Sequence, residues 1–129
     1  MFSHVTLGVS DVDQALGFYA PLMAHLKLEQ KFHQTGTMAG WQPPGQPHIL
    51  FVICRPFNEQ PASAGNGSMV AFNATTRAQV DQCYAAALEH GGTCDGPPGP
   101  RPQYHADYYG AYFRDPDGNK ICVCCHTVA

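Results

Sequence analysis

One pattern occurs twice in this chain, and this repeat is the strongest constraint on its fold. The segment HVTLGVSDVDQALGFY, which starts at His4, aligns with MVAFNATTRAQVDQCY, which starts at Met69. In this alignment Tyr19 matches Tyr84, and apolar positions match apolar positions. Two copies separated by about half the chain indicate a duplicated supersecondary unit, because solenoid arrays use at least three shorter repeats. The sequence therefore predicts two similar modules.

The first copy predicts a strand, a helix and three further strands. Residues 4–9 alternate between apolar and polar side chains, which is typical of a half-buried strand. Ser10 and Asp13 resemble a capping box at the start of a helix, and Pro21 predicts an end or a kink of that helix near Ala20. The three strands that follow are predicted around Leu28–His33, Thr37–Gln42 and His48–Cys54.

The second copy predicts the same order. Thr76 and Gln79 form a second capping box, and Gly91 and Gly92 supply a stop for its helix. Closing strands are predicted around Ala111–Arg114 and Asn119–His126. The predicted fold class is α+β, with two βαβββ modules in one domain of residues 1–129. Module one spans about residues 1–57, a polar linker about 55–68, and module two about 68–129.

The composition excludes several classes of function. The chain of 129 residues is 44% hydrophobic and 13% charged, with a net charge of −3 and no basic cluster, so neither nucleic acid nor an anionic membrane is an expected partner. Its longest apolar run, Ile49–Cys54, is too short to cross a bilayer. Nothing at the N-terminus suggests export, so we expect a cytoplasmic protein with reduced cysteines.

Three segments resemble the glyoxalase/bleomycin-resistance/dioxygenase superfamily, whose members are also called vicinal oxygen chelate proteins. These segments are HVTLGVSDVDQALGFY, MVAFNATTRAQVDQCYAAALEHGG and YYGAYFRDPDGNKI. The resemblance implies that the strands of both modules curl into a cup-shaped mixed sheet. It also implies a small-molecule ligand in the cup. Active members hold a divalent metal there, with ligands from the first and last strands of each module.

The metal-ligand positions of that family are largely replaced in this chain. His4 matches the first position, but Met69 stands where a histidine is usual. The segment HILFVIC, the last strand of module one, contains no carboxylate, and Cys122 occupies the usual glutamate position. We therefore expect a degenerate metal site and no cofactor, with a divalent metal possible only through His4 and Cys122.

The cysteines near the C-terminus leave three interpretations open. Because a strand alternates its faces, Cys122 and Cys124 are predicted to point one way and Cys125 the other. Small apolar cysteines commonly fill a sheet interior, which is the first expectation. The alternatives are a reactive thiol and a soft-metal site built from His4, Met69 and Cys122, with Cys124 as a further ligand.

The segment Cys94–Gly110 is the other source of candidate site residues. It contains four prolines and three tyrosines, and its composition indicates little regular structure. Such a segment is typical of a lid or binding loop, although a rigid surface loop or dimer contact is the alternative. Its candidate pocket residues are Tyr104, His105, Tyr108 and Tyr109, with Arg101 as an anion clamp, and the cup wall adds Trp41 and Phe51.

Two functions compete on this basis, with a third as a further alternative. The first is a small-molecule binder, or an enzyme without the usual metal, that uses the cup and the loop. The second is a metal-dependent lyase or isomerase of the glyoxalase type, for which Asp107 is the only candidate base. The third is a drug-sequestering resistance protein. The sequence leaves open whether the protein is an enzyme. Its low charge content predicts a homodimer.

Overall fold

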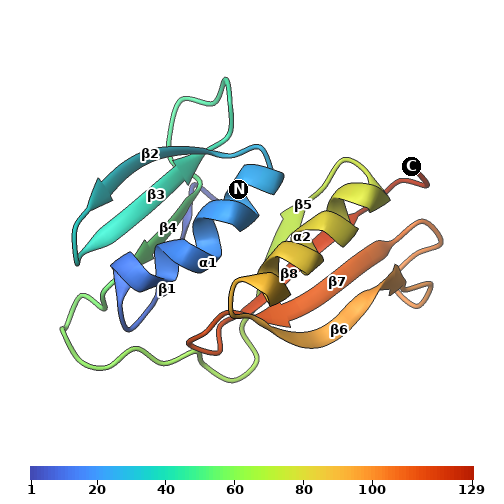
Figure 1. Ribbon diagram of the computed structural model, residues 1–129. Coiled ribbons are helices and arrows are strands. Elements are labelled where there is room, and N and C mark those ends of the chain that lie inside the picture. Colours follow the sequence, from blue (N-terminus) through green and yellow to red (C-terminus); the bar gives the residue numbers. More distant parts are fainter.

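The computed structural model describes residues 1–129 and contains two βαβββ modules that lie side by side (Figure 1). The first module comprises β1 (Val5–Gly8), α1 (Val12–His25), β2 (Glu29–Gln34), β3 (Met38–Gln42) and β4 (Phe51–Cys54). The second comprises β5 (Val70–Asn73), α2 (Arg77–Glu89), β6 (Thr93–Pro100), β7 (Tyr109–Arg114) and β8 (Lys120–Cys125). The predicted α+β class and the duplicated module are both confirmed.

Each module forms one four-stranded mixed sheet. The strand orders are β1-β4-β3-β2 and β5-β8-β7-β6, so the two sheets have the same topology. The first strand of each module pairs in parallel with the last, and the remaining pairs are antiparallel. Neither sheet closes on itself, and α1 and α2 pack next to each other (Figure 1). This arrangement is consistent with the curled cup expected from the sequence.

Helix α1 continues past Pro21 and ends at His25, so it does not end near Ala20, which was one of the two effects expected of this proline. Proline removes one backbone donor, which leaves the carbonyl of Gly17 without its helical partner, but Gly17 is exposed and water can replace that donor. Burial of Leu22 and Met23 in the core then favours continuation of the helix. The cap also differs from the prediction, because Asp11 rather than Ser10 accepts the hydrogen bond from the backbone of the first turn.

Strand β6 corrects the expectation that residues from Cys94 to Gly110 have little regular structure. Residues 93–100 pair with β7, although they include three prolines. Strand β6 lies at the edge of its sheet, where proline is tolerated because only one side of the strand must donate hydrogen bonds. The pairing of β6 with β7 also contains two register shifts, which interrupt its regular hydrogen bonding. The irregular loop is therefore shorter, from Arg101 to Tyr108.

A buried carboxylate connects the two modules. Asp115, at 3% exposure, follows β7 and accepts a hydrogen bond of 2.5 Å from the hydroxyl of Tyr19 in α1. Its other carboxylate oxygen accepts from the backbone N–H groups of Asp117 and Asn119, at 2.9 and 2.8 Å. The Asn119 side chain donates to Asp115 and to the carbonyl of Gly8, both at 2.9 Å. The DPDGN turn thus fastens module two to β1 and α1.

None of the helices has the length and apolar character that crossing a bilayer requires.

Candidate functional site

The two faces of β8 have different surroundings, as the alternation of its residues predicted. Ile121, Val123 and Cys125 belong to the large core shared with the helices. Cys122 and Cys124 point to the opposite face, where they form a small separate cluster with Tyr108. This opposite face of the second sheet is called the cup face below.

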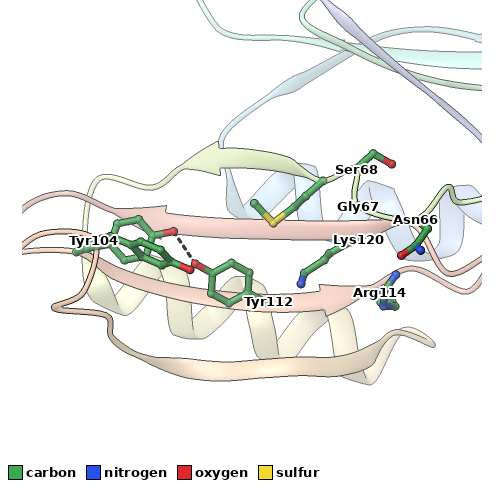
Figure 2. A pocket seen from close by; sticks show the side chains of 9 residues that line it. Asn66, Gly67, Ser68, Tyr104, Tyr112, Arg114 and Lys120 are labelled. Atoms are coloured by element: carbon green, nitrogen blue, oxygen red, sulfur yellow. Dashed lines mark hydrogen bonds between the residues drawn. The ribbon is translucent and has the colours of Figure 1, made fainter.

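A cavity of about 600 Å³ lies on the cup face of the second sheet (Figure 2). Its wall combines aromatic side chains with two cations and one thioether. Helix α2 lies on the opposite side of the sheet from the cavity (Figure 2). The residues that line it are Asn66, Gly67, Ser68, Met69, Tyr104, Tyr108, Tyr112, Arg114 and Lys120. They come from the segment directly before β5, the loop before β7, and strands β7 and β8.

Three tyrosines form one wall of this cavity. The hydroxyls of Tyr108 and Tyr112 are hydrogen-bonded at 2.8 Å, which the dashed line in Figure 2 marks. The ring of Tyr104 meets that of Tyr108 edge to face, with centroids 5.0 Å apart. Burial raises the pKa of both Tyr108 and Tyr112 above that of a free phenol. Both therefore stay protonated at neutral pH and can donate hydrogen bonds to a ligand.

Two cations form the other wall. Lys120 and Arg114 occupy opposite positions on β8 and β7, because these residues are paired in the sheet register. Each lies 3.2 Å from the same carboxylate, that of Asp95. The ammonium of Lys120 is also 5.6 Å from the centre of the Tyr112 ring. One carboxylate balances only one of the two cations, and no acidic residue lines the cavity. The local charge therefore favours an anionic ligand.

Several of the candidate site residues meet at or next to this cavity. Met69, at 44% exposure, and Tyr104 and Tyr108 line it. Cys122 lies beneath them, with its sulfur 3.5 Å from the Tyr108 hydroxyl. His105 is adjacent, and its ring contacts Tyr108 at a centroid distance of 5.6 Å.

Two residues of the predicted binding loop have other roles. The hydroxyl of Tyr109 donates to Asp81 of α2 at 2.7 Å, and its ring lies 5.0 Å from the guanidinium of Arg77, so Tyr109 faces the helix. Arg101 donates to the carbonyl of Pro97 at 2.7 Å and does not line the cavity, although its guanidinium is 5.5 Å from the Tyr112 ring. The Arg101 guanidinium therefore binds backbone carbonyls of β6.

The structure corrects the placement of Trp41 and Phe51. Both are fully buried in the large core. The centroids of their rings lie 6.4 and 5.5 Å from that of the Tyr19 ring. They are paired across β3 and β4, so both project from the same face of the first sheet, which is the face that α1 covers. The cup face of these strands carries the residues that alternate with them.

The residues at the family's metal positions do not form a metal site. His4 is exposed, and its Nδ1 atom is 2.9 Å from the hydroxyl of its neighbour Ser3. Met69 supplies only a thioether, and Cys122 is buried against Tyr108. No group of three or more histidine, cysteine, aspartate or glutamate side chains in the chain is arranged to hold a metal ion. The donor set therefore does not fit the divalent metal of active relatives, and the soft-metal interpretation has no geometric support.

Sequence reasoning missed Tyr112, Arg114 and Lys120, which carry much of the site. Strand alternation contains part of the signal, because Lys120 is two residues before Cys122 and so shares its face. The register supplies the rest: Tyr112 is opposite Cys122, and Arg114 is opposite Lys120. That register is a tertiary property, which single segments do not reveal.

Known proteins support the same fold. The sequence model of the glyoxalase/bleomycin resistance protein/dioxygenase superfamily matches residues 1–123. A glyoxalase/bleomycin resistance protein from Albidiferax ferrireducens T118 is 40% identical, with a TM-score of 0.83 over 97% of this chain and 98% of that one. No curated protein sequence matches this chain. The mixed βαβββ modules and these matches define the class, and the chain belongs to this superfamily.

More distant structures share the fold only. A lactoylglutathione lyase from Agrobacterium tumefaciens is 20% identical, with a TM-score of 0.68 over 97% of this chain and 92% of that one. The fosfomycin resistance protein FosX from Listeria monocytogenes is 19% identical, with a TM-score of 0.68 over 99% of this chain and 94% of that one.

Proposed function

We propose that the protein binds a small anionic molecule with an aromatic or apolar body in the cavity on the cup face, without the divalent metal of active relatives. The observation that carries this proposal is the cavity wall, where protonated tyrosines stand beside Lys120 and Arg114 and no carboxylate is present. The two cations and the phenolic O–H groups can donate hydrogen bonds to an anion. The tyrosine rings can pack against an apolar body of the ligand.

A glyoxalase-type lyase is less well supported by this cavity. That chemistry needs a Lewis acid and a base that moves a substrate proton. The cavity lining contains no histidine, aspartate or glutamate, and Asp107, the one candidate base, is exposed and does not line it. The proposal is therefore binding in the cavity rather than lyase or isomerase chemistry there.

Charge removal tests this proposal. We expect Lys120→Gln or Arg114→Gln to weaken binding of phenylphosphonate by about tenfold or more, since a hydrogen bond to a charged group is worth about 1.5–3 kcal/mol and 1.4 kcal/mol is tenfold in affinity. Lys31→Gln is the matched control, because Lys31 is an exposed lysine of the other module that pairs only with Glu29. Isothermal titration calorimetry at low salt measures the affinities, and thermal melting checks that each variant folds.

The neutral analogue benzamide provides the second comparison. It shares the aromatic body of phenylphosphonate but lacks its charge, so we expect it to bind much more weakly to wild type. Equal affinities for the two compounds, or an equal loss in the Lys31→Gln control, would contradict the proposal.

We propose also that the protein forms a homodimer in a reducing, cytoplasmic compartment. The six free cysteines agree with a reducing compartment. The large apolar side chains of Phe2 and Phe57 are almost fully exposed, and pairing would cover apolar surface of this kind. Multi-angle light scattering at micromolar concentration should give twice the chain mass of 14.0 kDa. A monomer mass under these conditions would rule the dimer out.

A further inference from the structure

A cysteine and two histidines form a continuous hydrogen-bonded array beside the cavity. The sulfur of Cys124, in β8, lies 3.7 Å from Nε2 of His126, just beyond the end of that strand. Nδ1 of His126 lies 2.9 Å from Nε2 of His105, in the loop before β7. The two ring planes differ by 23° and their centroids are 5.2 Å apart, as expected for rings joined edge to edge by one N–H···N bond.

The direction of every hydrogen bond in this array follows from one backbone group. The N–H of Asp107 can only donate, and it donates to Nδ1 of His105 at 3.2 Å. Nδ1 of His105 is therefore an acceptor, so in the neutral ring the proton is on Nε2, which donates to Nδ1 of His126. His126 in turn carries its proton on Nε2. That N–H points at the sulfur of Cys124 and stabilises a thiolate there.

The other neighbours of this sulfur also favour the thiolate. Cys122 lies on the same strand face, and Tyr108 packs over both cysteines. On the flanking strands, the residues opposite Cys124 are Asn73 and Gly110, neither of which carries a negative charge. The neighbouring thiol of Cys122, together with Tyr108 and His126, lowers the pKa of Cys124 to about 6 against the opposing effect of burial. The same contact raises the pKa of Cys122.

Cys124 differs in this respect from the buried thiol of Cys83 and the half-buried thiol of Cys54. Burial alone raises the pKa of Cys83 to about 12, and burial also raises the pKa of Cys54. Neither of these has a histidine or tyrosine hydrogen-bond partner in the structure. Of the two cysteines on the cup face, Cys124 is the one that a histidine N–H reaches, and its pKa is lowered while that of Cys122 is raised.

We propose that Cys124 is a nucleophilic site that adds to small α,β-unsaturated carbonyl compounds entering through the cavity. A thiolate is a soft nucleophile, and the electrophilic carbon of such a compound is soft. The phenols of Tyr108 and Tyr112, which line the cavity, can donate an O–H to the oxygen on which charge develops. This inference does not depend on the anionic ligand of the proposed function.

The addition is balanced without any further reactant except water. A sulfur lone pair forms a C–S bond to the β-carbon, the π electrons of the double bond move to the carbonyl as an enolate, and water protonates the α-carbon. His126 is a positioning residue here, because its N–H holds the thiolate and does not touch the electrophile. Cys124 is 5% exposed and lies next to Tyr108, which lines the cavity, although Cys124 itself does not line it. This restricts the reaction to small electrophiles that can pass Tyr108.

Methyl vinyl ketone is a suitable probe. We expect a limiting amount, added to a Cys94→Ser variant that lacks the exposed thiol, to modify Cys124 before any other cysteine, as peptide mapping by mass spectrometry would show. The rate should be nearly constant from pH 7 to pH 9 and fall by about half near pH 6, where half of the thiolate is lost. Modification of other cysteines while Cys124 stays free in the folded protein would overturn the proposal.

Variants of the exposed His126 test the array itself. We expect His126→Ala to slow the modification of Cys124 at pH 6.5 by about tenfold and to move its pH profile to higher pH, because the thiolate loses an N–H donor. His126→Gln keeps an N–H donor and should restore much of the rate. A purely structural role of His126 would leave the pH profile in place. An unchanged rate and profile in His126→Ala, with the fold intact by circular dichroism, would also overturn the proposal.

Discussion

Replacing Asp115 with alanine is expected to lower the free energy of unfolding by about 3–5 kcal/mol, since each hydrogen bond to a charged group is worth about 1.5–3 kcal/mol and buried donors left unpaired add a penalty. Its carboxylate accepts from the Tyr19 hydroxyl, from two backbone N–H groups and from the Asn119 side chain. The substitution would leave the Tyr19 hydroxyl buried without a partner and would loosen the turn that joins the modules.

The neighbouring Asp117 provides the matched control. It belongs to the same turn, but its side chain accepts one hydrogen bond, from the backbone of Ser10 at 3.1 Å, in an exposed setting. We expect Asp117→Ala to cost less than about 1.5 kcal/mol, because this hydrogen bond is exposed and water can replace the carboxylate as acceptor. Urea unfolding followed by circular dichroism measures both variants. A cost for Asp115→Ala no larger than that for Asp117→Ala would refute the role assigned to the buried network.

Gly92→Ala is expected to destabilise the fold by about 2–3 kcal/mol, in the range typical of overpacking. A Cβ atom at this position would lie 2.8 Å from the carbonyl oxygen of Ala87, 2.8 Å from the ring of Phe18 and 3.0 Å from the carbonyl oxygen of Arg114. Two of these three neighbours are backbone atoms of α2 and β7, so they cannot turn aside as a flexible side chain could. The chain would have to shift where α2 leads into β6.

Gly17→Ala should have the opposite sign. Gly17 lies inside α1, is exposed, and a Cβ atom there would have no neighbour within 4 Å. Alanine in a helix interior is more favourable than glycine by about 0.5–1 kcal/mol. Thermal or urea unfolding of the two variants should therefore move in opposite directions from wild type. A stabilising Gly92→Ala would mean that the helix and β7 do not approach as closely as described.

The sequence by itself determined the architecture, because the architecture depends on local periodicity. The repeat starting at His4 and Met69 predicted two modules, and β1 and β5 begin one residue after these positions. Alternation along β8 correctly separated Cys122 and Cys124 from Cys125, since side chains on a strand point to opposite faces. The resemblance carried by the DPDGN segment identified the family that the comparisons confirm.

Tertiary structure decided which face of each strand meets the core and which segments meet each other. Trp41 and Phe51 are aromatic residues of a kind that often lines pockets, but α1 covers the face of the sheet from which they project. Pro21 predicts an end or a kink near Ala20, but burial of the residues after it favours continuation of the helix to His25. Both outcomes depend on packing partners, which a local pattern does not contain.

The candidate site shows the same division most clearly. Tyr112 is brought opposite Cys122 by strand register, and His105 meets His126 because the loop before β7 returns to the end of β8. Strand alternation placed Cys122 and Cys124 on one face, but nothing local to β8 indicates that a histidine from another segment orients the ring beside Cys124. Long-range pairing of strands fixes these contacts. The chemistry of this site is therefore a property of the folded sheet rather than of any one segment.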